Sequence, residues 1–560
     1  MKTVGKILLS LLAILLAIVF VLYLLLQTRW GASWLSRTIS QHSHYQLNFS
    51  KVEHNFSDPS HLLLDDVSFG HKTRPAILVA RKVDLGLSLT QFTRPLHFAS
   101  VLLQKGTLRI TDKTSNLPFS ADRLQLSEMA VNSLHDPLPM NAQRVDGGVM
   151  PWKPLQGNFI GSHASFQMSA GSLTFKGIPA SNVLIQGRIN GRQLTLSNVG
   201  ADMARGSMTA SAQRDDQGNW QVDTLRLNSL RLQSNRSLAD FLQPLLTLPS
   251  VHFGRVDVTD ARLEGQEWAV TDLDLALKNV TLRNGDWESD EGSLSMNAGN
   301  FVNGTLQLND PIVNMTFSPQ GVALTQFSTR WVNGLVRASG NWTRGDKKLT
   351  LDEVVIAGLE YTLPQNWRQR WNASLPNWLD SVAVTKLNVS HNLIIDIDPD
   401  FPFQMTSLDG TGAGLMLARH HQWGILEGKM SFNAAEATFN RVDLRHPSLA
   451  LSADNNVINV TEMSAFPRNG MIEGLATVSQ QPQRALSLSL QGHDVPLNLL
   501  QDWGWPAVPL TGNGELTLKM QASLAKESPL KPSVNGTLSA TSGDKTLQQV
   551  VQAGEAVNAH

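Results

Sequence analysis

Alternation of apolar and polar side chains dominates the stretch RINGRQLTLSNVGADMARGSMTASAQRDDQGNWQVDTLRLNSLRLQ, which spans Arg188–Gln233. Leu194 and Leu196 share one parity, as do Leu225 and Leu227, and a polar residue separates the members of each pair. Successive side chains of a strand point to opposite faces, so the pattern predicts strands that are apolar on one face only. The function depends on what this apolar face meets: a second sheet, a membrane or a ligand.

The same alternation recurs along nearly the whole chain. Candidate strands lie at Val83–Leu89, Gly106–Asp112, Gly254–Gly265, Val270–Arg283, Asn303–Asp310, Val384–Asn392, Arg484–Gly492 and Gly514–Gln521. Asn-Gly pairs, which supply the positive φ of tight hairpins, begin at Asn190, Asn284, Asn303, Asn333 and Asn535. Helical patterns are confined to residues 28–42, 237–246, 364–382 and 497–503. The fold class is therefore predicted to be mainly β, with a few short helices.

The sequence predicts about 25 to 30 strands, and open sheets beyond roughly ten strands curl, split or pack against one another. One solution is an elongated, curled antiparallel β-sheet whose inner face forms an apolar groove. The other is a series of β-sandwiches whose inner faces bury each other. Both solutions give each strand one apolar face, so the periodicity leaves the choice open.

A long apolar segment, ILLSLLAILLAIVFVLYLLL, runs from Ile7 to Leu26 without a charged residue. As a helix rising about 1.5 Å per residue, it matches the roughly 30 Å hydrocarbon core of a bilayer. Trp30 and Trp34 follow it at positions suited to interfacial anchors. A cleaved signal peptide is the alternative, but its apolar region is shorter, about 7–15 residues. We expect an uncleaved, single-pass signal-anchor helix with a cytoplasmic amino terminus.

The composition excludes several classes of function. The chain has 46 basic and 47 acidic side chains among 560 residues, so no charge excess favours a nucleic-acid partner. It has no cysteine, which excludes disulfides, thiolate catalysis and thiolate metal sites. Charged residues make up 17% of the chain, below the roughly 25% of an average globular domain.

One acidic motif is similar to the start of a calcium-binding loop. It reads Asp396-Ile-Asp398-Pro-Asp400. Phe401 stands where such a loop needs glycine, and Ser407 stands where it needs a bidentate glutamate. The motif is therefore interpreted as a solvated strand end.

The remaining candidate motifs carry no chemistry. His42 and His44, like His420 and His421, have no Asp, Glu or His partner at a metal-binding spacing and are interpreted as surface residues. The run GTGAG at Gly410–Gly414 lacks the spacing of a dinucleotide site. No catalytic residue, metal site or cofactor is predicted, and the chain is not expected to be an enzyme.

Two parts of the chain combine alternating strands with a short helix in a distinctive order. The first reads WLSRTISQHSHYQLNFSKVEHNFSDPSHLLLDDVSFG and continues with VARKVDLGLSLTQFTRPLHFASVLLQKGTLRITD. Its order of anchor, short helix and alternating strands resembles that of the amino-terminal region of the AsmA family, and a later segment resembles another recurring piece of that family. The second is HDVPLNLLQDWGWPAVPLTGNGELTLKMQASL, at His493–Leu524. The family's usual closing glycine-rich strand pair is not evident after Leu547.

The resemblance implies four regions. These are a cytoplasmic tip and transmembrane signal-anchor at 1–28, an AsmA-like amino-terminal β region at 29–150, an extended repetitive β-sheet region at 151–490, and an AsmA-like carboxyl-terminal region at 491–560. It also implies a Gram-negative inner-membrane protein whose bulk lies in the periplasm, with the apolar groove preferred to the sandwiches.

The leading function implied by the resemblance is phospholipid transport between the inner and outer membranes, which supports outer-membrane homeostasis. The expected partners are the inner membrane, a phospholipid ligand and a possible envelope protein at the carboxyl-terminal end. A non-conducting assembly or tethering factor for outer-membrane proteins is the alternative, and an enzyme acting on envelope lipids or glycans is a distant third. The candidate lipid-facing residues are Leu194, Leu196, Leu225, Leu227, Leu273, Leu275, Leu277, Leu486, Leu488, Leu490, Leu516 and Leu518.

Overall fold

The structure is a computed structural model. It describes residues 2–55, 57–72, 75–110, 117–133, 140–155, 158–175, 177–247, 250–525 and 529–557, with the backbone alone at 2–9 and 245–246. All described strands, β1 to β35, belong to one hydrogen-bonded sheet, and most neighbouring strands are antiparallel. A continuous, mainly antiparallel sheet was one of the two predicted solutions, whereas serial sandwiches would require separate sheets.

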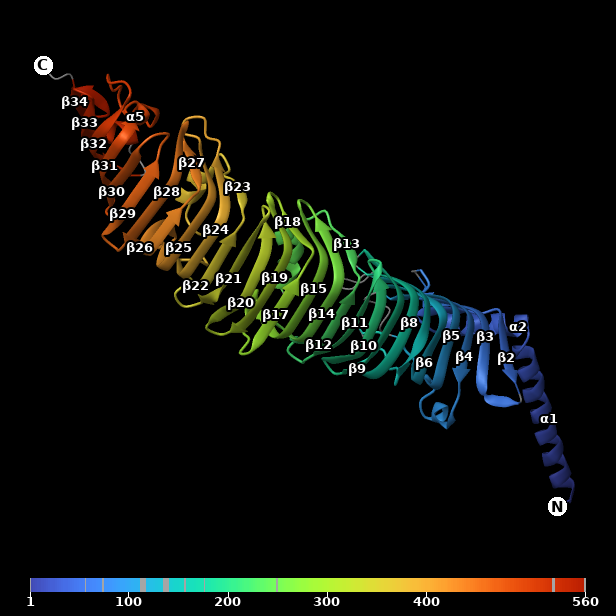
Figure 1. Ribbon diagram of the computed structural model, residues 1–560. Helices are drawn as coiled ribbons and strands as arrows, with labels where there is room; N and C mark the ends of the chain where they lie inside the picture. Colours follow the sequence, from blue (N-terminus) through green and yellow to red (C-terminus); the bar gives the residue numbers. More distant parts are fainter. Residues whose placement is uncertain are drawn as a thin grey trace. The chain divides into compact units, whose positions relative to one another are not determined.

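The chain divides into two compact units, Met1–Glu264 with Leu277–Asp286, and Gly265–Ala276 with Trp287–His560. The helices and strands of unit 1 are α1 (Lys2–Leu26), α2 (Arg29–Gln41), β1 (Tyr45–Asn48), β2 (Lys51–Asn55), β3 (Asp58–His71), β4 (Leu78–Gly86), η1 (Leu89–Phe92), β5 (His97–Ile110), β6 (Ser120–Ser133), β7 (Met140–Met150), β8 (His163–Phe175), β9 (Ile178–Asn190), β10 (Gln193–Met203), β11 (Gly206–Arg214), β12 (Trp220–Asn228), β13 (Arg231–Gln233), α3 (Leu238–Leu246) and β14 (Ser250–Gly265). Figure 1 shows consecutive strands of this unit side by side.

Three strands carry residues of both units: β14, whose last residue Gly265 belongs to unit 2, β15 (Trp268–Arg283) and β16 (Asp286–Trp287). Unit 2 continues with β17 (Gly292–Asn297), β18 (Asn300–Asn303), β19 (Leu306–Ser318), β20 (Gly321–Trp331), β21 (Gly334–Thr343), β22 (Lys348–Ala357), β23 (Glu360–Thr362), α4 (Trp367–Asn372), β24 (Ser381–Asp396), β25 (Phe403–Arg419), β26 (Gln422–Asn433), β27 (Glu436–Phe439), β28 (Val442–Ala453), β29 (Val457–Phe466), β30 (Met471–Ser479), β31 (Ala485–Pro496), α5 (Leu499–Asp502), β32 (Asn513–Ser523), α6 (Leu530–Ser533), β33 (Asn535–Ser542), β34 (Lys545–Gln552) and β35 (Glu555–Val557).

Tight turns account for most connections, as the Asn-Gly pairs predict. Asn284 and Gly285 turn between β15 and β16 with φ of 49° and 80°, the backbone that the type I′ hairpin needs. The pairs at Asn190, Asn303 and Asn333 also lie at hairpin turns. The pair at Asn535 does not, because it begins strand β33.

The helix prediction for residues 364–382 is largely wrong. Only Trp367–Asn372 is helical, and Ala373 ends α4 in an extended conformation. Pro376 soon follows, and a proline disfavours helix both at its own position and at the residue before it. Val382 belongs to β24, where it pairs in parallel with Leu349 of β22. The other predicted helices correspond to α2, α3 and the short α5.

A short antiparallel strand pair lies at the carboxyl-terminal end, where no glycine-rich pair is evident in the sequence. β34 pairs antiparallel with β35, with Val551 opposite Ala556. Ala553 and Gly554 form the turn with φ of 49° and 78°. The sequence offers no Asn-Gly or Asp-Gly pair at this turn, which is why the pattern missed it.

β-Bulges keep the apolar side chains on one face where the strict alternation fails. In β6, Leu124, Leu126, Met129 and Val131 are all buried, although Met129 has the opposite parity to Leu126. Glu128 between them has φ of 51°, and the register against β7 shifts on either side of Met129. Such a bulge bends its strand and increases the local twist. Asp66 in β3, Lys105 in β5 and Arg144 in β7 have the same backbone conformation.

The amino-terminal helices meet at a sharp bend. Among the described residues, no single helix has the length and hydropathy of a membrane span, but Ser10–Leu26 and Arg29–Gln41 meet these criteria together, with a bend of 90°. Thr28 caps α2 by accepting a hydrogen bond from the backbone N–H of Gly31. The side chain of Ile7, a predicted anchor residue, lies outside the described side chains. Leu26 ends α1, and Trp30 and Trp34 are exposed on α2.

Candidate functional site

One face of the sheet in unit 1 carries continuous rows of apolar residues. Directly opposed residues of paired strands lie on the same face. One row runs through Leu62, Leu85, Val101, Leu124, Val149, Phe166, Gly187, Leu196, Ala212, Val222 and Phe253. The next row runs through Leu64, Val83, Leu103, Leu126, Gly147, Met168, Ile185, Val199, Ala210, Leu225 and Val256. We call the face that these rows form the apolar face of unit 1.

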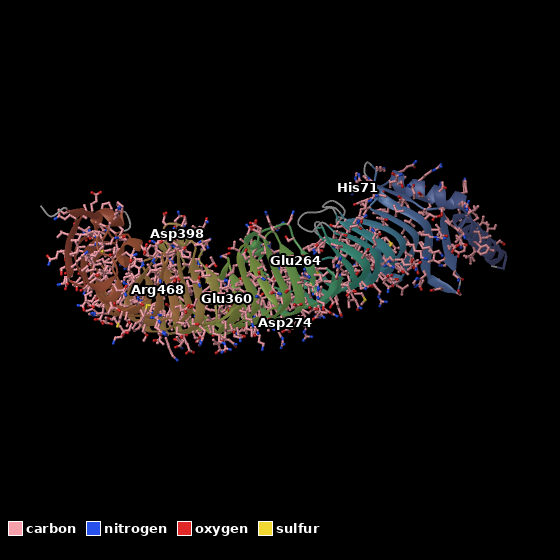
Figure 2. The ribbon with its side chains drawn as sticks, turned by 45° about the horizontal axis from the view of Figure 1, so that its top comes forward. His71, Glu264, Asp274, Glu360, Asp398 and Arg468 are labelled. Carbon is pink, nitrogen blue, oxygen red and sulfur yellow. The ribbon has the colours of Figure 1, made fainter. Side chains whose placement is uncertain are left out.

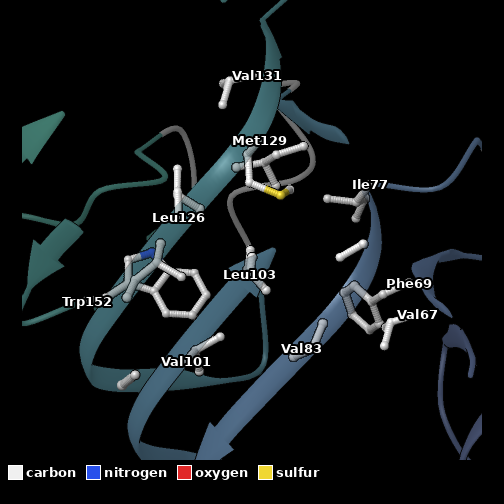
Figure 3. Packing of buried hydrophobic residues seen from close by; sticks show 14 of the residues in the cluster. Val67, Phe69, Ile77, Val83, Val101, Leu103, Leu126, Met129, Val131 and Trp152 are labelled. Carbon is white, nitrogen blue, oxygen red and sulfur yellow. The ribbon is translucent and has the colours of Figure 1, made fainter. Parts of the chain in front are cut away.

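The opposite face of the same strands carries polar and charged residues. Asp65, Lys82, Gln104 and Ser127 form a row of directly opposed residues there. Figure 3 shows the contrasting side, where Val83, Leu103 and Leu126 project from three neighbouring strands into one shared space. The sheet of unit 1 is therefore amphipathic across many strands.

A cavity of about 540 Å³ opens on the apolar face of unit 1, near the amino-terminal helices. Leu35 and Ile39 of α2 line it together with side chains of β1 to β5. A chain of aromatic rings forms part of its wall, with centroids 5.2 to 5.8 Å apart: Tyr45, Phe69, Phe119, Trp152 and Phe159. Such a volume falls within the roughly 300–1,000 Å³ of pockets that hold small apolar ligands.

Two polar side chains near this cavity form hydrogen bonds within the protein. The indole N–H of Trp152 donates to the carbonyl oxygen of Phe159 at 2.9 Å. Ser36, buried on α2, donates to the carbonyl oxygen of Leu47 at 2.5 Å. The cavity wall is therefore suited to hydrocarbon and offers little to a polar ligand.

Unit 2 has an apolar face of the same kind. One row runs through Val336, Ile356, Val389, Gly410, Phe432, Leu449, Met463, Gly474, Leu490, Leu518 and Leu538. A second row runs through Met296, Val313, Phe327, Ala338, Val354, Leu387, Gly412, Met430, Leu451, Val460, Ala476, Leu488, Met520, Gly536 and Val551. We call the face that these rows form the apolar face of unit 2.

A second cavity, also of about 540 Å³, opens on the apolar face of unit 2. Leu449, Met463 and Leu490 line it from β28, β29 and β31, and Phe432 and Trp503 contribute aromatic rings. Each unit therefore presents its own apolar cavity on an apolar sheet face.

At the carboxyl-terminal end the apolar face is covered by the chain itself. Leu497, Leu500 and Trp505, in and around α5, are buried in one cluster with Leu516 and Leu518. The indole N–H of Trp505 donates to the side-chain oxygen of Gln549 at 2.9 Å and so fixes this cover on the sheet. This part of the face is packed core.

Comparison with known proteins identifies the family. The AsmA family profile matches residues 1–547. The chain belongs to the AsmA family. It is 53% identical over 552 residues to the AsmA family protein YicH of Escherichia coli (strain K12), an alignment that covers 99% of this chain and 97% of that relative. The chain matches no solved structure.

The predicted lipid-facing residues of this AsmA-family chain lie on strands with one apolar face. In unit 1, Leu194 and Leu196 are partly buried and pack against the main cluster of buried apolar residues of that unit. Leu225 and Leu277 pack around Val251, Phe253 and Val256. Leu227 of β12 lies opposite Val258 of β14. In unit 2, Leu486, Leu488 and Leu490 of β31 lie opposite Ala522, Met520 and Leu518 of β32, respectively. Leu516 of β32 lies opposite Gly492. On β15, Leu273 is buried and Leu275 is half-buried. Whether they face lipid stays a prediction.

The sequence reasoning missed the aromatic residues of the two cavities. Tyr45, Phe69 and Trp152 belong to separate strands or loops, and only the pairing of the sheet brings them together. Isolated aromatic residues at apolar positions were the available signal. They predict burial, but they do not predict a shared cavity.

Charged groups of this AsmA-family chain gather away from the apolar faces. His61 Nδ1 lies 2.7 Å from Asp84 Oδ1, and this hydrogen bond raises the pKa of His61. Hydrogen bonds from Arg231 and Ser229 lower the pKa of the Asp260 carboxyl. Figure 2 marks His71 at the end of β3, and Asp398 and Arg468 in the connections that follow β24 and β29.

The predicted solvated strand end at Asp396–Asp400 needs correction. Asp396 is only 2% exposed and accepts a hydrogen bond of 3.0 Å from the indole N–H of Trp367. Asp398 forms an ion pair with Arg368 of α4 at 3.1 Å. The motif therefore fastens α4 to the end of β24. Among the described residues, no group of three or more His, Asp or Glu side chains is arranged to hold a metal ion.

Proposed function

We propose that this AsmA-family chain is an inner-membrane-anchored periplasmic protein that carries phospholipids toward the outer membrane, with acyl chains on its apolar faces. The observation that carries the proposal is the unbroken cross-strand apolar rows of each unit, such as the row from Leu62 to Phe253. A sheet curled around these faces would form the groove that lipid carriage requires, and the bulge at Glu128 favours such bending.

The energetics favour a long apolar track over a single pocket. Moving an acyl chain from a bilayer into water costs about 0.8 kcal/mol for each methylene group exposed. A carrier must therefore cover most of the chain at every step of transfer. A row of neighbouring strands with apolar side chains provides this cover without gaps. The two cavities of about 540 Å³ are positions where a chain could rest.

The anchor is part of the proposal. The helix pair Ser10–Leu26 and Arg29–Gln41 has the combined length and hydropathy of a membrane segment. We place α1 in the inner membrane with its amino terminus in the cytoplasm, and Trp30 and Trp34 at the lipid–water interface. The strands then lie in the periplasm.

A tethering or assembly factor is the second candidate, and one observation favours it. The apolar face near α5 is filled by Leu497, Leu500 and Trp505, so the chain seals its own face at this end. A protein whose apolar faces were sealed throughout would hold an envelope partner without carrying lipid. The cavity lined by Leu449 and Met463 argues against complete sealing.

Site-specific photo-crosslinking in cells separates the two candidates. In the full-length chain, the photo-crosslinking residue p-benzoylphenylalanine replaces Leu78, which lines the cavity of unit 1, or Val79, which is exposed on the polar face. In unit 2, the same photo-crosslinking residue replaces Met463, which lines the cavity, or the neighbouring Glu462, which is exposed. Lipid carriage predicts phospholipid adducts at Leu78 and Met463 but not at their neighbours. Adducts to protein alone, or equal lipid labelling of both faces, would favour tethering.

A further inference from the structure

The connection between β4 and β5 exposes large apolar side chains to solvent. Leu89 and Phe92, both in η1, are 83% and 88% exposed, and Leu96 is also exposed. Isolated exposed apolar residues are common, but several in one short loop mark an interaction surface. Residues 87–97, LSLTQFTRPLH, contain one arginine and no acidic residue.

This loop has a defined conformation. Ser88 caps η1 in a capping box with Gln91, so both side chains bond to the backbone of the turn. The side-chain amide of Gln91 also donates to the carbonyl oxygen of His97 at 2.6 Å. The exposed position of Leu89 and Phe92 is therefore built into the turn.

A chain of hydrogen bonds places the loop on the same rim of the sheet as the anchor helix. The hydroxyl of Tyr23, near the end of α1, lies 2.7 Å from Nδ1 of His54. Nε2 of His54 lies 3.0 Å from the carbonyl oxygen of Pro59. The next residue, Ser60, accepts a hydrogen bond of 2.6 Å from the N–H of Leu87, where the loop begins. In Figure 1 both α1 and the β4–β5 connection extend from this rim.

We propose that the loop Leu87–Leu96 inserts into the leaflet of the bilayer that surrounds the carboxyl-terminal half of α1, as a second membrane contact. Tyr23 lies within the apolar segment of α1, so a rim joined to Tyr23 lies at the membrane surface. Leu89 and Phe92 then enter the acyl region, and Arg94 meets lipid phosphates. The inference rests on the proposed membrane anchor.

The same loop joins the membrane to the cavity of unit 1. Leu96 is exposed on the loop and also lines the cavity, and Phe98 continues the lining into β5. An acyl chain leaving the bilayer along Phe92 and Leu96 would meet apolar side chains until it reaches the cavity. The loop is therefore the entry point for lipid in addition to a second anchor.

Spin labelling tests the insertion directly, because the natural chain has no cysteine. Three single variants, Phe92→Cys, Leu16→Cys and Lys72→Cys, carry a nitroxide in the full-length chain within phosphatidylethanolamine–phosphatidylglycerol vesicles. Lys72 is the matched control, because it directly follows the last residue of β3. The 14 residues of β3 separate it from the rim that carries the loop. The expected result is high collision rates with oxygen and low rates with a water-soluble nickel chelate at Leu16 and Phe92, and the reverse at Lys72.

The outcomes separate the inference from the anchor on which it rests. In one outcome, the label at position 16 lies in lipid, but the label at position 92 is as accessible to the nickel chelate as the label at position 72. That result overturns the insertion of the loop and leaves the membrane anchor standing. A water-exposed Leu16 label overturns both. As a second readout, Leu89→Ser combined with Phe92→Ser should lower phospholipid cross-linking from position 78 several-fold, whereas Val550→Ser, at an exposed residue of β34, should not. Equal yields would remove the entry role.

Discussion

Leu488 and Leu518 project from the neighbouring strands β31 and β32 onto the same face of the sheet, but only Leu518 is covered by the chain. Leu490 lies directly opposite Leu518. Leu488 is two residues before Leu490 on the same strand, so its side chain points to the same face. Leu518 is 4% exposed and packs in the cluster with Leu500 and Trp505, whereas Leu488 is half-buried. The same residue type on one face thus has two environments.

This difference predicts that a charge destabilises the fold far more at Leu518 than at Leu488. Leu518→Arg should destabilise the fold by about 3–5 kcal/mol, because an unpaired charge would be buried in a packed cluster. Leu488→Arg should cost far less, since its guanidinium can reach solvent. Thermal unfolding of the two variants beside the natural chain checks this. Equal losses of Tm would mean that Leu488 is also packed core.

Leu488→Arg should still interfere with lipid. A charge on the apolar face of unit 2 repels acyl chains, so photo-crosslinking from position 463 should yield several-fold less phospholipid adduct. The control is Leu475→Arg, because Leu475 lies one strand away on β30 and is exposed on the opposite face. A parallel loss in both variants would point to general disruption of the sheet.

The pair of His61 and Asp84 predicts a pH dependence of stability. The hydrogen bond to Asp84 raises the folded-state pKa of His61 above its usual value, and Asp58 adds to the effect. Its stabilisation is therefore fully present below the unfolded pKa, about 6.5, and is lost as the pH rises through the folded pKa. His61→Gln should lower Tm more at pH 5.5 than at pH 8.5.

The control for His61 is a histidine without a carboxylate partner. His163 Nδ1 lies 2.8 Å from the amide oxygen of Asn190. His163→Gln, which removes a hydrogen bond to an uncharged amide, is therefore measured beside His61→Gln at the same two pH values. A loss for His61→Gln that did not depend on pH would show that the pair contributes through packing alone.

A buried amide predicts a large effect on stability in unit 2. Asn392 is 1% exposed, accepts a hydrogen bond from the N–H of Leu359 at 2.8 Å, and donates to the carbonyl oxygen of Leu408 at 3.3 Å. Asn392→Leu leaves the N–H of Leu359 without a partner, so it should cost about 1–3 kcal/mol of unfolding free energy. Asn388→Leu, whose amide bonds to Glu353 at the surface, should cost under about 0.5 kcal/mol. Denaturant titrations that gave equal costs would contradict this role.

The bend between α1 and α2 depends on Gly31. A Cβ atom at this position would overlap the carbonyl oxygen of Leu25, so Gly31→Ala should open the 90° bend. Spin labels at Leu16→Cys and Ser50→Cys report the angle as a distance distribution. The distribution should shift in Gly31→Ala and stay unchanged in Ser33→Ala, which alters an exposed residue of α2. An unchanged distribution in both would show that the bend tolerates a side chain there.

Period-two alternation predicted the hairpins well but could not predict the bulges. Leu126 and Met129 are three positions apart, so the alternation assigns them to opposite faces. The backbone of Glu128, with φ of 51°, returns Met129 to the apolar face. Nothing about a glutamate at this position signals a left-handed backbone conformation, which glycine and asparagine adopt more readily.

The contrast between Leu488 and Leu518 also lay beyond the sequence pattern. Both were candidates for the apolar face, and both lie on it. The cover over Leu518 comes from the segment around α5, whose position depends on contacts such as that between Trp505 and Gln549. A single sequence records the apolar character of each strand but does not record which loop folds over it.

The strand pairing has a consequence for how this protein could change over evolutionary time. Each long strand bonds to the strand before it and the strand after it, so stability is a sum of nearest-neighbour terms. Successive antiparallel strands run in opposite directions, so their connections alternate between the two rims of the sheet. Duplicating or deleting a pair of adjacent antiparallel strands would preserve this alternation and keep every remaining apolar row in register. The number of strands can therefore change in two-strand steps without redesign of the interior of either unit.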